Sequence, residues 1–171
     1  MNLTMKDVNT MSKQEFVDSV GSVFEHSPWV AEHSWELHPF SNLARMYEVM
    51  IQKMYEAEDS LKLSLLRAHP DLGTKLEISE SSQNEQMNAG LSQLTEEEYK
   101  EFSSMNQRYI EKFSFPFIMA VKGQNKTKIK ACMEQRVENR YDLEFKTALK
   151  EVSKIAKFRL WDKIDEQVKT H

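Results

Sequence analysis

The chain is poor in the residues that make turns and cross-links. Its 171 residues include four glycines, four prolines and one cysteine. A lone cysteine, Cys132, excludes an internal disulfide and a zinc site built from several cysteines. The sequence also lacks an apolar run of membrane-spanning length, and its first residues lack the apolar stretch of a signal peptide. We therefore expect a cytoplasmic protein with no membrane partner.

A basic excess is also lacking, and this argues against one class of partner. The formal net charge is −4, with both signs interspersed, and 40% of the residues are hydrophobic. Nucleic-acid-binding domains usually carry a basic patch, so we expect no nucleic-acid partner. An anionic substrate would have to be bound by local positive groups, because the net charge does not attract it.

Helical patterning covers nearly the whole length. Apolar residues recur at steps of three and four, and capping boxes at Ser12–Glu15, Ser82–Glu85 and Thr95–Glu98 mark three helix starts. We predict an all-α fold, a single-domain bundle of about eight helices over residues 1–171. Residues 161–171 are expected to form either its end or a tail or linker.

One stretch interrupts this pattern and carries a titratable ring. Pro70 disfavours helical geometry at His69, and Gly73 permits a sharp turn, so a helix must end with an imidazole beside a turn. Such a histidine can take part in chemistry near neutral pH, or merely complement the helix dipole. The residues alone leave both interpretations open.

Glu85 is a second candidate, and it too has two interpretations. As the last residue of a capping box it can simply bond the start of its helix. Alternatively, the helix start over Ser82–Gln86 brings amides and a carboxylate close to His69, and helix starts bind anions well.

Arg159 is a third candidate because it continues an inward-facing stripe of the C-terminal helix. An arginine on a buried face needs an internal acid, a route past the helix end to solvent, or an anionic ligand. Arg136 and Arg140 are expected at the surface or in ion pairs, with Glu144 four positions after Arg140. The stripe before Arg159 consists of Phe145, Ala148, Val152 and Ile155.

The apolar run over residues 113–121 is a fourth candidate. Pro116 prevents a regular helix there, so backbone amides between Phe117 and Val121 are expected to lack helical partners. Such amides suit the binding of a flat polar ring, although the run can equally be an ordinary part of the hydrophobic core.

The three histidines between residues 26 and 38 are not spaced as a metal pair on one helix face, so we expect no metal site.

Taken in order, these motifs resemble the 2-oxo-4-hydroxy-4-carboxy-5-ureidoimidazoline (OHCU) decarboxylase family. The resemblance runs from about Met5 to Trp161, and it looks closest to the amino-terminal decarboxylase domain of the bacterial bifunctional decarboxylase–urate oxidase. The motifs are His69-Pro70-Asp71-Leu72-Gly73, Ser82-Gln83-Asn84-Glu85-Gln86, Phe115-Pro116-Phe117-Ile118, and the series Arg136, Asn139-Arg140, Glu144, Ala148-Leu149, Ile155 and Arg159-Leu160.

The resemblance implies a cofactor-free enzyme that converts OHCU to (S)-allantoin and CO2 in urate degradation. It implies that His69 is the general acid, that Glu85 orients His69 or the substrate hydroxyl, and that Arg159 holds a substrate carbonyl or carboxylate. The substrate-binding positions that it implies are Pro70, Ser82, Gln83, Asn84, Gln86, Phe117, Ile118, Met119, Ala120 and Val121.

The resemblance also implies a homodimer, with urate oxidase as a fused or functional partner. Three alternatives stay open. One is a non-enzymatic helical interaction module, which predicts no pocket among His69, Glu85, Phe117 and Arg159. Another is a metal-dependent helical hydrolase, which predicts sensitivity to chelators. The third is a family member that acts on a different ureido or carboxy-imidazoline substrate.

Overall fold

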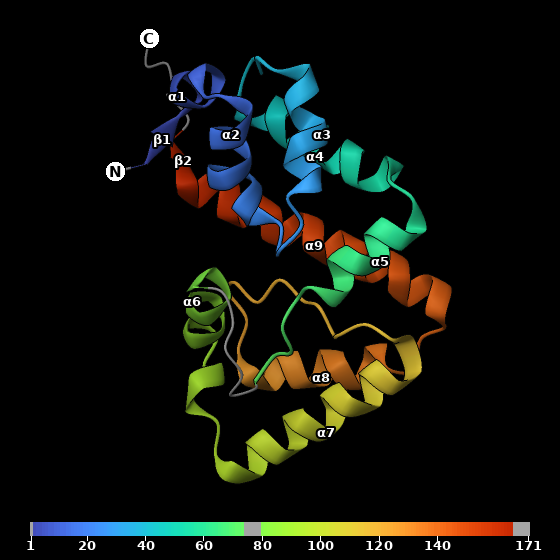
Figure 1. Ribbon diagram of the computed structural model, residues 1–171. Coiled ribbons are helices and arrows are strands. Elements are labelled where there is room, and N and C mark those ends of the chain that lie inside the picture. Colours follow the sequence, from blue (N-terminus) through green and yellow to red (C-terminus); the bar gives the residue numbers. More distant parts are fainter. Residues whose placement is uncertain (1, 74–79, 166–171) are drawn as a thin grey trace. The chain divides into compact units, whose positions relative to one another are not determined.

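The computed structural model describes residues 2–73 and 80–165. The chain forms two compact units, one of residues Met1–Leu65 with Ser153–His171 and one of Leu66–Val152. Helices make up most of both units (Figure 1). Among the described helices, none combines the length and the apolar character that crossing a membrane requires. The prediction of a single domain stays a prediction.

The first unit contains several short helices and the longer helix α4 (Leu43–Glu56). Buried aromatic and methionine side chains form its core, and α3 packs against α4. The strands β1 and β2 pair in parallel, with Leu3 opposite Ile164. The elements of this unit are β1 (Leu3–Thr4), α1 (Met5–Thr10), α2 (Lys13–Ser19), a 3-10 turn (Gly21–Val23), α3 (Trp29–Ser34), a second 3-10 turn (Trp35–Leu37), α4 (Leu43–Glu56), most of α5 (Asp59–Arg67), the end of α9 (Tyr141–Lys163) and β2 (Ile164–Asp165).

The second unit is built around a cluster of buried aromatic rings. Tyr109 lies at its centre, with ring centroids 4.6 Å from Phe113 and 5.4 Å from Phe117. The helices α7 and α8 lie side by side across the unit (Figure 1). Its further elements are α6 (Glu80–Asn88), a 3-10 turn (Leu91–Gln93), α7 (Glu96–Phe113), α8 (Lys126–Arg136) and the first part of α9.

The all-α prediction is confirmed, with two additions. The described residues contain nine α-helices, against about eight expected, and one short strand pair. The capping boxes at Ser12 and Thr95 are confirmed, because both partners of each box bond as expected. The additional helix α1 begins with an equivalent box between Thr4 and Asp7. An aspartate replaces the usual glutamate there, which is why this helix start was missed.

The predicted helix start at Ser82 is wrong. The helix α6 begins at Glu80, so Ser82 and Glu85 both lie within it. Three serines occur between residues 79 and 82, and each is a residue type that caps helices, so local sequence cannot choose among them. Of the predicted tail, residues 161–165 belong to α9 and β2, and residues 166–171 lie outside the described part of the chain.

Gly73 and Gly123 make a matched pair for testing the turn after α5. Both have a positive φ, +73° and +77°. A Cβ added at Gly73 would lie 3.1 Å from both Leu94 Cδ1 and Phe102 Cγ, whereas at Gly123 it would meet nothing within 4 Å. We predict that Gly73→Ala lowers the free energy of unfolding by about 2–4 kcal/mol and Gly123→Ala by about 1 kcal/mol. Urea denaturation measures both values, and equal losses would contradict the steric argument.

Candidate functional site

The turn after α5 holds His69 in a buried position. The helix ends at Arg67, and the backbone amide of His69 donates to the Leu66 carbonyl at 3.2 Å. His69 is only 8% exposed. The helix end predicted from Pro70 and Gly73 is confirmed. A buried imidazole has less room to move than an exposed one, which favours positioned proton transfer.

Two buried side chains from other helices hold the next residues of this turn. Gln86 of α6 donates to the Asp71 carbonyl at 3.2 Å and accepts from the Gly73 amide at 3.0 Å. Asn106 of α7 donates to the Leu72 carbonyl at 2.8 Å. Three consecutive residues of the turn therefore have backbone groups bonded to side chains. Local sequence does not indicate a role for Asn106, because this residue lies in a helix of ordinary pattern.

The helix α6 presents the predicted substrate-binding positions in different environments. Ser82 and Gln86 are buried, Glu85 is partly buried, and Gln83 and Asn84 are exposed. The side-chain amide of Gln86 is engaged by the turn, as described above. The roles of these positions toward a substrate stay predictions.

The segment between α7 and α8 is irregular, as Pro116 predicts. Phe117 and Ile118 are buried. The Ala120 amide lacks a helical partner but donates to the Glu151 carboxylate at 2.9 Å, and the Ile118 carbonyl accepts from a guanidinium at 2.6 Å. Side chains thus replace the missing helical bonds at these two points.

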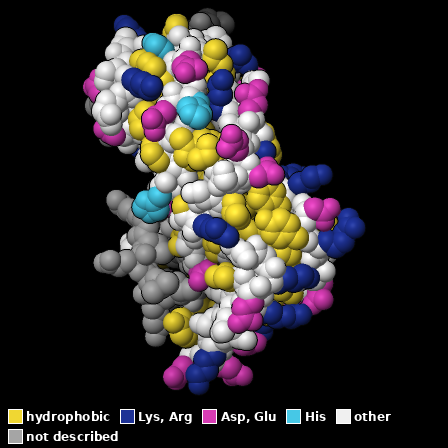
Figure 2. All heavy atoms as spheres, turned by 45° about the vertical axis from the view of Figure 1, so that its right-hand side comes forward, with side chains coloured by type: hydrophobic (Ala, Val, Ile, Leu, Met, Phe, Trp, Pro, Cys, Tyr) yellow, Lys and Arg dark blue, Asp and Glu magenta, His cyan; other side chains and the backbone are white. Residues whose placement is uncertain are grey.

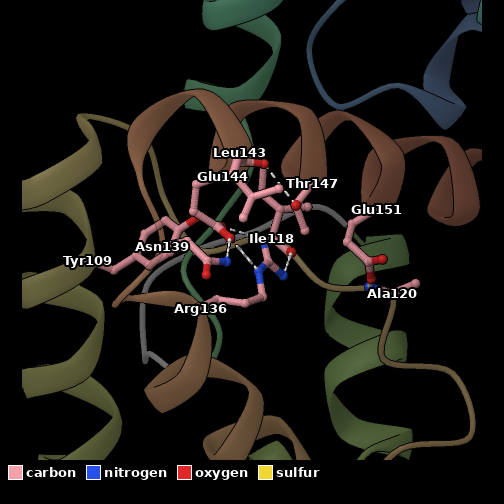
Figure 3. A network of polar contacts seen from close by, with 9 residues as sticks. All are labelled: Tyr109, Ile118, Ala120, Arg136, Asn139, Leu143, Glu144, Thr147 and Glu151. Carbon is pink, nitrogen blue, oxygen red and sulfur yellow. Dashed lines mark hydrogen bonds and ion pairs between the residues drawn. The ribbon is translucent and has the colours of Figure 1, made fainter.

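That guanidinium belongs to Arg136, which is part of the polar network in Figure 3. Arg136 Nε lies 3.1 Å from both carboxylate oxygens of Glu144, and its Nη2 lies 2.8 Å from one of them. Tyr109 and Asn139 donate to the same carboxylate. The guanidinium also lies 4.4 Å from the ring centroid of Phe117. The network therefore fixes both the backbone and a ring of the irregular segment.

Glu144 is fully buried, so its donors must compensate the loss of water. The partner of Glu144 is Arg136, not Arg140, which instead lies 3.5 Å from Asp142. Burial raises the pKa of the Tyr109 hydroxyl, and its bond to Glu144 adds to the effect. Tyr109 therefore keeps its proton and remains a donor at neutral pH.

Arg159 is buried in the first unit and has an acid partner there. It is 8% exposed, which confirms the prediction from the helix stripe. Its Nη2 lies 2.9 Å from Glu25 Oε1, and its Nη1 donates to the Val23 carbonyl at 3.3 Å. Glu25 lies in a turn, outside any helix pattern, so local sequence does not indicate it as the partner of Arg159. His69 and Arg159 belong to different units, and a shared role for them stays a prediction.

Charged side chains of both signs lie on the surface, as the composition predicts. Figure 2 shows Lys and Arg side chains interspersed with Asp and Glu over the face that it draws. Within the described residues, the buried arginines are Arg136 and Arg159.

No group of three or more His, Cys, Asp or Glu side chains in the described residues is arranged to hold a metal ion. Cys132 is partly buried, and burial raises the pKa of its thiol, which does not favour a nucleophile.

We predict that Arg136→Ala lowers the free energy of unfolding by about 3–5 kcal/mol, because it leaves the fully buried Glu144 carboxylate without its cation. Arg108→Ala is the matched control, since Arg108 pairs with Glu138 where both side chains are more than half exposed. The control should cost less than about 1 kcal/mol. Urea denaturation compares the two variants, and a loss for Arg136→Ala as small as that of the control would contradict the role of the network.

Comparison with known proteins agrees with the motif resemblance. A model of the OHCU decarboxylase family matches residues 9–161. The OHCU decarboxylase of Halalkalicoccus jeotgali is 45% identical over 158 residues, which are 92% of this chain and 90% of that protein. The uric acid degradation bifunctional protein PucL of Bacillus subtilis is 44% identical over 98% of this chain, which spans 34% of that protein.

Two solved structures share the fold of this chain. The crystal structure of (S)-allantoin synthase superposes with a TM-score of 0.75 at 31% identity, over 95% of this chain and 55% of that one. An OHCU decarboxylase structure determined in the presence of (S)-allantoin shares the fold, with a TM-score of 0.71 at 22% identity over 82% of this chain and 94% of that one. With the family model matching most of its length, this chain belongs to the OHCU decarboxylase family.

Proposed function

We propose that the protein decarboxylates OHCU to (S)-allantoin and CO2, without a metal or an organic cofactor. The observation that carries this proposal is the identity to proteins named OHCU decarboxylase, 45% and 42% over more than nine-tenths of the chain. The buried His69 beside a clamped turn supports it, because the reaction needs a positioned acid. A homodimer and a functional link to urate oxidase are part of the same proposal.

The chemistry explains why no cofactor is required. The departing carboxylate sits on a carbon of an unsaturated ring that also bears the hydroxyl. When CO2 leaves, the electron pair delocalises over the ring as an enol or enolate, so the substrate itself acts as the electron sink. One proton delivered to one face then gives a single enantiomer. The protein must hold the carboxylate, stabilise the developing charge and supply that proton.

In this proposal the roles of the side chains are those that the motif resemblance implies. His69 donates a proton to the carbanion-like intermediate, which balances the loss of CO2 from the carboxylate, and is then reprotonated from solvent. Glu85 orients His69 or that hydroxyl. Arg159 binds a substrate carbonyl or carboxylate, because a guanidinium matches both oxygens of a carboxylate. Pro70 forms a wall of the pocket.

Two segments supply the remaining contacts in this proposal. Residues 82–84 of α6 and residues 117–121 bind the ring and the ureido group through polar and backbone groups, and Gln86, whose side-chain amide is bonded to the turn after α5, supports that turn. The Ala120 amide already donates to Glu151. Ala120 is therefore proposed to contact the substrate through its side chain, and its neighbours are proposed to bind the substrate through their backbone amides.

The proposed function is tested by generating OHCU in place with urate oxidase and the upstream hydrolase. We expect the protein to accelerate the loss of the OHCU absorbance over spontaneous decay, and the allantoin to be the (S) enantiomer by circular dichroism. A chelator should leave the rate unchanged. No acceleration would refute the decarboxylase, and a rate abolished by the chelator and restored by metal would favour the metal-dependent alternative.

We predict that His69→Asn lowers kcat by about 10²- to 10⁴-fold, which is the range that a positioned general acid contributes. Asparagine is similar in size to the histidine, so helicity and the urea unfolding midpoint should stay close to those of the wild type. His33→Asn is the matched control, because His33 is exposed. Full decarboxylation by the His69→Asn protein would eliminate the acid role.

We predict that removing Arg159 mainly raises KM, by about 10- to 100-fold, the value of a charge-assisted hydrogen bond. Arg159→Ala alone would leave Glu25 buried without its cation, so the substitution is made together with Glu25→Gln. Glu25→Gln by itself is the control. If KM in the double variant equals that of the control, Arg159 has a structural role alone.

A further inference from the structure

We propose that Gln86 and Asn106 form a clamp that positions His69 for proton transfer. The clamp consists of their three hydrogen bonds to the backbone of residues 71–73. The proposal deepens the proposed function and rests on it. In this proposal the side-chain amides of Gln86 and Asn106 bind the backbone of the turn. Both are positioning residues, which affect the reaction through His69.

The two clamp residues come from separate helices and are both buried. Gln86 lies on α6 and is 7% exposed, and Asn106 lies on α7 and is 3% exposed. Gln86 lies 13 residues after Gly73 in the chain, and Asn106 lies 34 residues after Leu72. Hydrogen bonds between buried groups are stronger than those in water, so these bonds hold the turn to both helices at once.

The turn needs such partners because its backbone lies outside any helix or sheet. Buried amides and carbonyls must be paired, and residues 71–73 have no regular ladder to pair them. Gly73 restricts the conformation of the turn further. Its φ is +73°, and the space between its Cα and the side chains of Leu94 and Phe102 is too small for a Cβ. The clamp therefore satisfies the turn in one conformation.

The restraint reaches His69 through a stiff link. Pro70 joins the clamped residues to His69, and its ring fixes its own φ. Pro70 therefore leaves fewer free backbone torsions between the clamped residues and His69 than another residue would. A catalytic group has to stay within about 0.5 Å of its productive position, and a misplacement of about 1 Å can cost about 10²-fold in rate.

An unusual feature of Asn106 supports the assignment. Its Oδ1 is buried and has no hydrogen-bond partner within the described part of the chain. An unsatisfied buried carbonyl costs stability, so a leucine would serve mere packing better. The bond that the amide makes is the one from its nitrogen to the Leu72 carbonyl, so its donor is the part of this side chain that the turn uses.

The test uses near-isosteric variants of the full chain in the coupled OHCU assay. Asn106→Leu and Gln86→Met remove the clamp bonds and keep the size of the side chain. We expect kcat to fall by about 10- to 100-fold, with KM within about twofold of the wild type, since proton delivery is disturbed and substrate binding is not. Gln86→Glu keeps an acceptor for the Gly73 amide and loses the donor to Asp71, so its kcat should lie between those of Gln86→Met and the wild type.

Gln107→Met is the matched control. Gln107 is adjacent to Asn106 but exposed, and its amide bonds to Glu111 on the same helix at 3.1 Å. Its removal should change neither kcat nor KM. A second readout is independent of turnover: the imidazole NMR signals of His69 should shift or broaden in Asn106→Leu and Gln86→Met and stay unchanged in Gln107→Met.

The outcomes separate the clamp from the proposed function. An inactive wild type refutes the function, and unchanged His69 signals in both clamp variants would then refute the clamp as well. With an active wild type, an unchanged kcat in both variants overturns the clamp. A raised KM with kcat unchanged also overturns it, because that result assigns the amides to substrate binding. If Asn106→Leu fails to fold, the comparison of Gln86→Met with Gln86→Glu decides in its place.

Discussion

A buried ion pair, between Arg136 and Glu144, joins three parts of the second unit. Arg136 ends α8, Glu144 lies in the first turn of α9, and the same guanidinium bonds the carbonyl of Ile118 and covers the ring of Phe117. Two charges removed from water are costly unless their hydrogen-bonding capacity is filled. Here Tyr109 and Asn139 fill the rest of it for the carboxylate. The irregular segment thus takes its shape from a fully bonded charge network.

The turn after α5 follows the same principle with neutral groups. Its backbone is held by the amides of Gln86 and Asn106, in place of the bonds that a helix would supply. The non-helical stretches around Pro70 and Pro116 are therefore both braced by side chains from neighbouring helices. Bracing of this kind gives an irregular backbone the rigidity that binding and catalysis need, while the helices supply the scaffold.

Local sequence predicted much of the helical framework because helix signals are local. The boxes at Ser12 and Thr95 and the break at Pro70 each involve residues within a few positions of one another. The same signals failed at Ser82, where several serines compete, and at Thr4, where the box uses aspartate. The burial of Arg159 was also predictable, since a stripe of apolar residues at helical spacing leads to it.

The sequence by itself determined the helical class, the position of the His69 turn, the irregular run around Pro116 and, through the order of its motifs, the family. Only the tertiary structure decided the partners: Glu25 for Arg159, Arg136 for Glu144, and Gln86 and Asn106 for the turn. The physical reason is the separation along the chain between the residues that interact. Helix caps and breaks are settled by neighbours in the chain, whereas a buried charge or amide is satisfied by whichever group packing brings to it, and that group can lie 134 residues away, as Glu25 does from Arg159.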